Sequence, residues 1–203
     1  MEFSTKEIET IAQQFASLIT KQLDLEEGIP IGQLEKTMQK QLQKMGQIAL
    51  GKVLTQADGH VERKIPCQCG GTLEYQRRRK AKVRSVFDWV TYKRSYYAGC
   101  ECGEGKAPLD QQFGLEPGGV TAGLASLMAL TGVELPFEHS SQFLERFLFF
   151  RSAGNTVRKE TQCFGRLQRQ REAKWIQEYE DDQVLLERER IHQEKPERIY
   201  GSM

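Results

Sequence analysis

Residues 67–102 read CQCGGTLEYQRRRKAKVRSVFDWVTYKRSYYAGCEC, and this stretch decides how the chain folds. A pair of cysteines stands at each end, Cys67 with Cys69 and Cys100 with Cys102, and one residue separates the members of each pair. Zinc binds four thiolates in a tetrahedron, and small β modules supply such ligands from two tight turns. We therefore expect the four cysteines to hold a structural zinc ion that brings both ends of the stretch together.

Two other roles for these cysteines stay open at this point. The usual zinc-binding turn has two residues between its cysteines, so the single-residue gap makes the pattern less specific. Reduced thiols can also fill a small core as inert apolar groups. A disulfide framework fits less well, because five cysteines is an odd number and the N-terminus lacks the apolar run of a signal peptide. The fifth, Cys163, is expected to pack in a helix.

Strand-forming and basic residues share the segment between the cysteine pairs. β-branched and aromatic side chains predict three short strands at about 72–79, 81–87 and 90–98, with a hairpin turn at Asp88-Trp89. The whole chain carries a formal net charge of only +1, but eight basic residues face a single acid between positions 77 and 94. Such a local excess is typical of a surface that binds a polyanion.

Most of these basic residues are candidate phosphate ligands on DNA. They are Arg77, Arg78, Arg79, Lys80, Arg84, Lys93 and Arg94. The run over 77–80 carries the most weight, because no acid nearby in the sequence compensates its charge. The alternative is an ordinary sheet with an apolar core on one face and solvated charges on the other.

Helical periodicity occurs on both sides of the strands. Ser4 and Glu7 form the pattern of a capping box, and apolar residues then recur at helical spacing to Leu23. Gly28 and Pro30 separate this helix from a second amphipathic one. After the strands, a connector is expected over 106–119, followed by helices at about 122–130, 137–150 and 155–164 and a long charged stretch over 166–192.

The second group of helices has the order of a helix-turn-helix unit. Asn155, Thr156, Arg158 and Lys159 stand in the first turns of its last helix, where a recognition helix meets bases and phosphates. These four are candidate DNA contacts, and Val157 is expected to face the core. A plain three-helix packing unit has the same pattern and stays the alternative.

These patterns predict an α+β protein that is mainly helical and has four parts. The parts are an amphipathic helical hairpin as leader (1–59), a small three-stranded, zinc-ribbon-like β module (60–110), a helix-turn-helix-like DNA-binding module (111–165), and a long charged helix with a linker (166–203).

Motifs along most of the chain occur in this order in a known family. The segments CQCGG…APLD (67–110), GLEPGG…FLERF (114–147) and GNTVRKE (154–160) resemble the N-terminal half of bacterial ISKra-type insertion-sequence transposases. The resemblance implies a DDE transposase, whose RNase H-like domain holds two divalent ions, usually Mg²⁺, on three acidic residues for attack at a phosphodiester. It also implies that the part in front of that domain binds DNA.

The resemblance assigns no catalytic residue to this chain, because on the family's pattern the first catalytic aspartate would follow Met203. Mg²⁺ would therefore belong only to the absent catalytic domain. Glu180, Asp181 and Asp182 lie in a charged helical run and are expected to form a solvated helix face.

The hypothesis is a truncated transposase that recognises double-stranded transposon ends and is inactive alone. We expect it in the cytoplasm on the nucleoid, with a second copy as a possible partner and with no membrane or small-molecule partner. Two other classes stay open: a zinc-dependent DNA-binding or oligomerisation module without a role in transposition, and an intact enzyme dependent on Mg²⁺.

Overall fold

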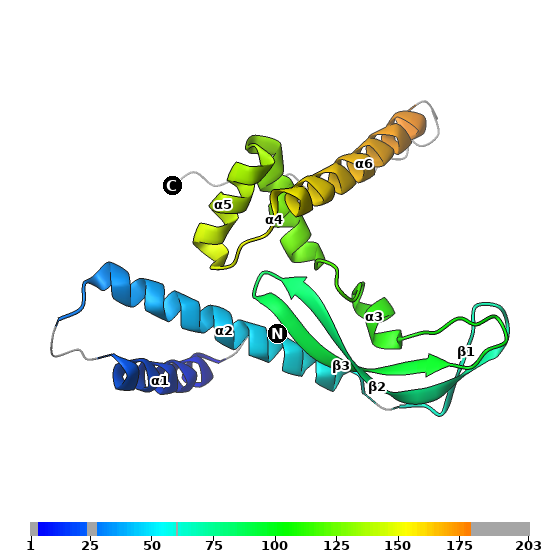
Figure 1. The fold of residues 1–203 in the computed structure, drawn as a ribbon, viewed down its shortest axis with the longest axis horizontal. Coiled ribbons are helices and arrows are strands. Elements are labelled where there is room, and N and C mark those ends of the chain that lie inside the picture. The colour runs from blue at the N-terminus through cyan, green and yellow to red at the C-terminus, as the bar shows by residue number, and fades with distance from the viewer. Residues whose placement is uncertain (1–3, 24–27, 60, 180–203) are drawn as a thin grey trace, which may run out of the picture. The chain divides into compact units, whose positions relative to one another are not determined.

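The computed structural model describes residues 4–23, 28–59 and 61–179, and their fold is α+β and mainly helical, as predicted (Figure 1). The element order is α1 (Thr5–Gln22), α2 (Ile31–Ala57), β1 (Lys64–Pro66), β2 (Thr72–Ser85), β3 (Asp88–Ala98), α3 (Pro108–Phe113), α4 (Ala122–Glu134), α5 (Phe137–Leu148) and α6 (Gly154–Tyr179). The chain divides into two compact units. The first contains the described residues up to 124 together with 145–151, and the second contains 125–144 together with the described residues from 152 onward.

The predicted capping box begins α1. The hydroxyl of Ser4 accepts from the N–H of Glu7 (3.3 Å), and the carboxylate of Glu7 accepts from the N–H of Ser4 (2.9 Å). These bonds to Ser4 lower the pKa of Glu7 and satisfy two backbone donors that the first turn leaves open.

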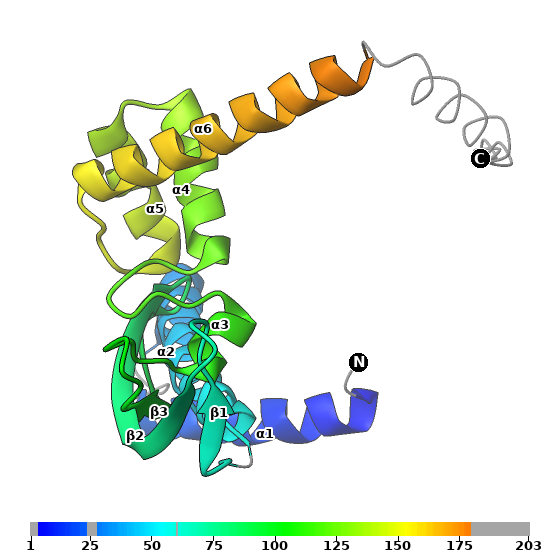
Figure 2. The ribbon, with the colours of Figure 1, turned by 90° about the vertical axis from the view of Figure 1, so that its right-hand side faces the viewer.

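The sheet is antiparallel in the order β1-β2-β3, and β2 and β3 form a long twisted ribbon (Figures 1 and 2). The prediction of separate strands at 72–79 and 81–87 is wrong, because β2 is unbroken there. Ala81 pairs with Tyr92 in continuous register across the predicted boundary. The sequence changes from basic to apolar at this point but contains no glycine or proline that would end a strand. The third strand is the short β1.

The hairpin turn lies at Val86-Phe87, two residues before the predicted Asp88-Trp89. The hydroxyl of Ser85 accepts from the N–H of Phe87 (3.0 Å) and donates to the carbonyl of Asp88 (3.2 Å). A buried serine therefore closes the turn, in the role that a turn-forming residue usually fills.

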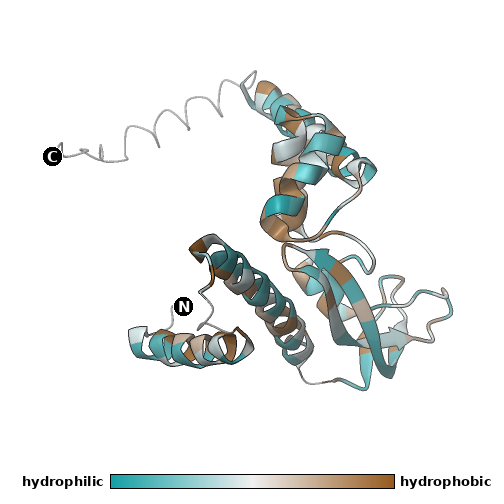
Figure 3. Cartoon of the chain, turned by 60° about the vertical axis from the view of Figure 1, so that its left-hand side comes forward, coloured by the Kyte–Doolittle hydropathy of each residue, from teal (hydrophilic) through white to brown (hydrophobic). Residues whose placement is uncertain are grey.

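The burial of alternate residues separates an apolar face of the ribbon from a basic face, and Figure 3 colours the same residues by hydropathy. The apolar face consists of Ala81, Val83, Val90 and Tyr92, which are buried together with Leu54 of α2 and Leu109 of α3. The basic face consists of the exposed residues that alternate with them, namely Arg78, Lys80, Lys82, Thr91 and Lys93. Successive side chains of a strand point to opposite sides, so one face builds the core while the other meets solvent.

Helix α2 lies along the outer edge of β3 and bonds to backbone groups that an edge strand leaves unpaired. We call these contacts the edge ladder: Gln47 donates to Trp89 O (2.7 Å), Thr55 accepts from Lys93 N–H (3.1 Å) and Asp58 accepts from Ser95 N–H (2.9 Å), and Gln43 donates to Val86 O in the adjoining hairpin turn. Residues four apart share one side of a helix, and outward-facing backbone groups recur at alternate positions of an edge strand. The two periods match between Gln47 and Thr55 of α2, which bond to Trp89 and Lys93 of β3.

Gly51 occupies the step of the edge ladder between Gln47 and Thr55. A Cβ atom at this position would lie 2.6 Å from the carbonyl oxygen of Thr91, which is closer than real Cβ contacts allow. Glycine is therefore what lets α2 approach the strand.

Gly51→Ala is expected to lower the free energy of unfolding by about 1–3 kcal/mol, because the added methyl group has to push α2 away from β3. In a helix without such a neighbour the same change stabilises by roughly 0.5–1 kcal/mol. Gly32 of α2 has nothing within 4 Å of its Cβ position, so Gly32→Ala is the matched control. Urea denaturation measures both variants, and equal stabilities would contradict the close packing of α2 on β3.

A short helix, α3, interrupts the predicted connector over 106–119. Pro108 stands at its first position, where the missing N–H costs nothing, and Gly114 ends it in a left-handed conformation (φ 59°). Leu109 is only 2% exposed and anchors this segment in the core of the first unit.

In the second unit α4, α5 and α6 contribute Met128, Leu144 and Val157 to a small core. Val157 is fully buried, as predicted. Gly132 of α4 lies so close to Thr161 of α6 that a Cβ atom would collide with its hydroxyl. The absence of a side chain at 132 therefore allows the two helices to pack.

The predicted boundary between a helix over 155–164 and a charged stretch from 166 is wrong, because α6 is one continuous helix to Tyr179. Gly165 lies at that boundary with open space around it. A helical glycine costs roughly 1 kcal/mol, which neighbouring helix formers outweigh. The acids at 180–182 and the rest of the charged run lie outside the described residues.

Candidate metal centre and basic surface

The four cysteines that flank the ribbon converge. Cys67 Sγ lies 3.5 Å from Cys102 Sγ, Cys69 Sγ lies 3.3 Å from Cys100 Sγ, and all four sulfurs lie within 4.8 Å of one another. Zinc–sulfur bonds of about 2.3 Å in a tetrahedron place sulfurs roughly 3.8 Å apart, whereas a disulfide requires about 2.05 Å. The four thiols can therefore hold one metal ion. We call them the cysteine cluster.

Two equivalent turns build the cysteine cluster. The N–H of Gly70 donates to Cys67 O (3.1 Å), and the N–H of Gly103 donates to Cys100 O (3.0 Å). Both glycines have positive φ, 88° and 76°, which a side chain would disfavour. Each C-x-C-G segment is thus one tight turn, and the antiparallel register of β1, β2 and β3 brings the turns together.

Gly71 leaves the space between the turns free. A Cβ atom at this position would lie 2.7 Å from Cys100 Sγ and 3.5 Å from Cys69 Sγ. Cys69 and Cys102 are exposed, so the cluster is not a packed core of inert thiols. The space and the donor set both fit a metal ion.

Backbone N–H groups and neighbouring thiols shift the pKa values of Cys100 and Cys102 in opposite directions. The N–H of Cys102 donates to Cys100, and together with the thiol of Cys69 it lowers the pKa of Cys100 to about 7. The N–H of Glu104 donates to Cys102, but the thiols around it, Cys67 first, outweigh this and raise the pKa of Cys102 to about 12. The N–H of Cys102 thus favours the thiolate form of Cys100, and N–H donors to sulfur are the kind of outer contact that supports thiolate ligands.

The chain is expected to bind one zinc ion at the cysteine cluster, measurable by elemental analysis of the purified protein. Structural zinc contributes about 10–16 kcal/mol in small zinc-finger peptides, so chelation is expected to unfold β1 and both cysteine turns. Hydrogen exchange should then rise there while the buried Val83–Val90 pair keeps its protection.

Cys102→Ser tests the same prediction without a chelator. It should lower the zinc content of the purified protein and raise hydrogen exchange at β1 and at both cysteine turns. Cys163, a half-buried residue of α6 as predicted, provides the matched control, because Cys163→Ser leaves the cluster intact. Unchanged exchange at β1 after complete metal removal would contradict a structural role.

Strand alternation divides the basic run over 77–80 between the two faces of the ribbon. Arg79 stacks its guanidinium over the ring of Tyr96 at 3.6 Å, and Arg77 pairs with Tyr96 on that same face. Arg78 and Lys80 point to the opposite, basic face. The four side chains therefore do not act as one patch.

The expectation that no acid compensates this run is wrong for Arg78. Its Nε lies 3.2 Å from the carboxylate of Asp58, whose side chain is 3% exposed. Asp58 is twenty positions away in the sequence and arrives at the end of α2, so only the fold reveals this ion pair.

Two further candidate phosphate ligands, Arg84 and Arg94, are mostly buried and form ion pairs with acidic residues of the chain. Arg94 pairs with Asp110 at 2.7 Å, and each side chain is 12% exposed. Asp110 also accepts from the hydroxyl of Tyr92 (2.8 Å), and burial raises the pKa of this carboxyl against the opposite effect of both partners. Arg84 is 17% exposed, pairs with Asp88 and donates to the carbonyl of Arg151. Contact of these two arginines with DNA stays a prediction.

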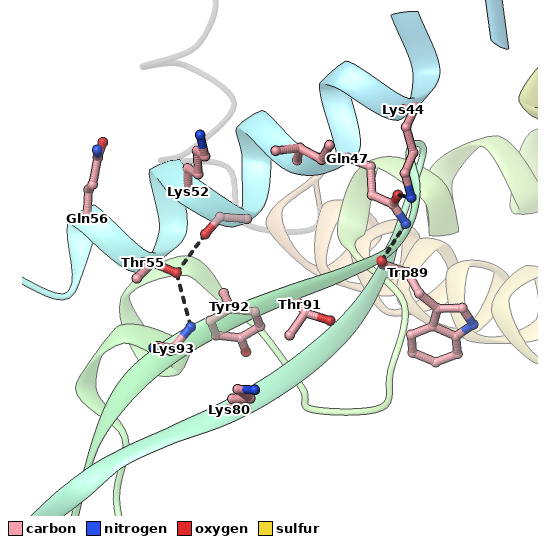
Figure 4. A pocket seen from close by; sticks show the side chains of 12 residues that line it. Lys44, Gln47, Lys52, Thr55, Gln56, Lys80, Trp89, Thr91, Tyr92 and Lys93 are labelled. Carbon is pink, nitrogen blue, oxygen red and sulfur yellow. Dashed lines mark hydrogen bonds between the residues drawn. The ribbon is translucent and has the colours of Figure 1, made fainter. Parts of the chain in front are cut away.

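Lys80 and Lys93 lie directly opposite each other across β2 and β3, both exposed on the basic face. Beside them the structure has a groove that sequence reasoning missed, an open cavity of about 750 Å³ between α2 and the basic face (Figure 4). Lys44 and Lys52 line it from α2. Their spacing of eight residues marks one side of a helix, but the sequence does not say what that side borders.

The candidate base contacts lie in the second unit. Asn155, Arg158 and Lys159 are exposed in the first turns of α6, and Thr156 is half-buried. They border the buried Val157, so the helix presents its polar side outward as a recognition helix would.

Comparison with protein-family models, with curated proteins and with solved structures gives no match for this chain. Within 4–23, 28–59 and 61–179, the structure has no helix that combines the length and the apolar character needed to cross a membrane.

Proposed function

We propose that this chain is a zinc-stabilised DNA-binding protein, the N-terminal portion of an ISKra-type insertion-sequence transposase that recognises transposon ends. The observation that carries the proposal is a four-cysteine cluster at one end of a ribbon whose exposed face is basic. The order of sequence motifs between residues 67 and 160 supports the assignment to this family.

The zinc ion has a structural role in this proposal. Four thiolates complete a tetrahedral site and leave no position for water or substrate, which is the arrangement of structural zinc. Zinc would fix both ends of the ribbon, so the β module acts as a zinc-ribbon-like scaffold for the basic face.

In this proposal the first unit provides affinity for DNA and the second unit provides sequence preference. Exposed cations that do not line the groove, such as Arg77 and Lys82, would neutralise phosphates, which provides affinity for any sequence. The polar side chains at the start of α6 would read base edges as the last helix of a helix-turn-helix-like module, which provides sequence preference.

In this proposal strand cleavage belongs to the RNase H-like domain that the family resemblance implies. Among the described residues, the cysteine cluster is the only group of His, Cys, Asp or Glu side chains placed to hold a metal ion. Its chemistry is that of a structural site.

The proposal is tested by fluorescence anisotropy with duplexes that carry the element's terminal sequences and with random duplexes of equal length. Lys82 is an exposed residue of the basic face outside the groove, and Lys82→Ala is expected to weaken binding to both duplexes and to reduce the slope of log K against log salt by about 0.9. Asn155→Ala is expected to remove about 5- to 150-fold of the preference for the terminal sequence, since a bidentate base contact provides about 1–3 kcal/mol.

Lys174→Ala is the matched control, because this α6 lysine is exposed and far along the helix from its first turn. Absence of affinity for either duplex would sink the proposal. Affinity without preference would leave a DNA-binding module but remove the recognition of transposon ends.

A zinc-dependent oligomerisation module is the second candidate. It is favoured by exposed apolar residues along α6, including Leu167, Trp175 and Ile176. Dimerisation that does not respond to salt, together with no affinity for DNA, would favour it over the first candidate.

A further inference from the structure

The groove beside the basic face is built by two elements in fixed register. Its α2 wall contains Lys44, Ile48, Lys52 and Gln56, spaced four residues apart, and its sheet wall contains Lys80, Trp89, Thr91 and Lys93 (Figure 4). The edge ladder holds these walls together, because Gln47 and Thr55 bond to the backbone of β3. The groove is therefore present before any ligand arrives.

The charge in the groove is positive and uncompensated. Four lysines and no acidic residue line it, and none of these lysines forms an ion pair with any residue that the structure describes. Lys80 and Lys93 are direct cross-strand neighbours, and like charges in this position destabilise a sheet. An anionic ligand between the walls would relieve that repulsion.

Protection of a sheet edge does not explain these lysines. Proteins place lysine on open edge strands to prevent pairing with other chains. Here α2 already covers the edge of β3 that carries Lys93, and Lys44 and Lys52 belong to the helix itself; Lys80 alone lies on a stretch of β2 that β1 does not pair. The charges therefore require another explanation, and binding an anion is the one that their position favours.

Lys44 is held in place before binding. Its ammonium group donates to Gln47 Oε1 (2.6 Å), and Gln47 Nε2 in turn donates to the carbonyl of Trp89 (2.7 Å). Figure 4 shows this chain of contacts running from α2 to the strand that carries the indole. One cation of the groove is thus connected through Gln47 to the backbone of the strand that carries Trp89.

The same groove offers surfaces for bases. The indole of Trp89 is 38% exposed, with the guanidinium of Arg84 5.6 Å from its ring centre, and Ile48 is 51% exposed. A row of cations beside an aromatic ring is the usual arrangement for an unpaired strand, whose phosphates meet the cations while bases stack.

We propose that the groove between α2 and the basic face binds single-stranded nucleic acid. Lys44, Lys52, Lys80 and Lys93 hold its phosphates, and a base stacks on Trp89. This assigns a second ligand class to a surface separate from the duplex-reading turn of α6, so it goes beyond the proposed function.

The test uses the full chain in a Trp175→Phe background, where Trp89 is the remaining tryptophan of the two. Titration with a twelve-residue oligothymidylate at low salt is expected to quench the Trp89 fluorescence. Lys52→Ala and Lys80→Ala should each weaken binding and reduce the salt slope by about 0.7, the value per phosphate contact on a single strand. Trp89→Ala, followed by anisotropy of a labelled oligonucleotide, should weaken binding by about 5- to 150-fold.

Lys36→Ala is the matched control, because Lys36 is an exposed lysine of α2 that does not line the groove. The inference is overturned if the oligothymidylate does not bind, or if Lys36→Ala weakens binding as much as Lys80→Ala. Equal binding of polyglutamate at the same lysines would overturn it too, since the groove would then accept any polyanion. Melting temperatures within the error of the parent chain establish that each variant is folded.

A duplex of equal length separates this inference from the proposed function. Lysine variants that weaken single-strand binding and leave duplex binding unchanged support both. If the duplex binds at the groove lysines more tightly than the single strand, the single-strand inference fails while DNA binding stands. If only the single strand binds, the proposed recognition of duplex ends is contradicted, and the inference that the groove binds single strands is supported.

Discussion

A long two-stranded ribbon leaves the outer backbone groups of its edge strand unpaired, and in this chain α2 satisfies those of β3. Isolated hairpins are marginal in water, and the short β1 adds only three residues of pairing at one end. Gln47 and Thr55 supply the missing partners at the other end, and Leu54 closes the apolar core from the same helix. The burial of the apolar face and the groove beside the ribbon both follow from this contact.

The ribbon is stabilised differently at its two ends. Near the turn Val83 and Val90 are fully buried, so burial of apolar surface stabilises this end. At the far end Leu73 and Tyr97 form a smaller cluster beside Cys67, and a metal ion held by the four thiols would supply what that small core lacks. Between the ends the strands carry charge on both faces, and the ion pairs of Arg78 and Arg94 tie that middle section to α2 and α3.

Local patterns predicted the parts of this fold that depend on local physics. The capping box at Ser4, the break at Gly28 and Pro30, and the α+β class follow from residues close in sequence. The convergence of the cysteines was also predictable, because paired spacing implies a shared ligand. The unbroken β2, the continuous α6 and the ion pair of Arg78 with Asp58 were not. The ion pair and the unbroken strand depend on contacts between segments that are distant in the sequence. The continuous α6 depends on whether the helix propensities of its other residues outweigh the cost of Gly165, which a sequence pattern does not decide. The groove was missed for the same reason, since Lys52 and Lys80 become neighbours only through the edge ladder.

Asp58 connects these features in a further way. Its carboxylate accepts from the N–H and the hydroxyl of Ser95 and also pairs with Arg78. Arg78 and Ser95 are register partners across β2 and β3, so one side chain contacts both members of one cross-strand pair. A slip of one residue would separate them and would turn every side chain of β2 to the other face. The carboxylate of Asp58 therefore favours the observed register of β2 and β3. In this register Val83 and Val90 are buried, Lys80 and Lys93 are exposed, and the two cysteine turns lie at the same end of the ribbon.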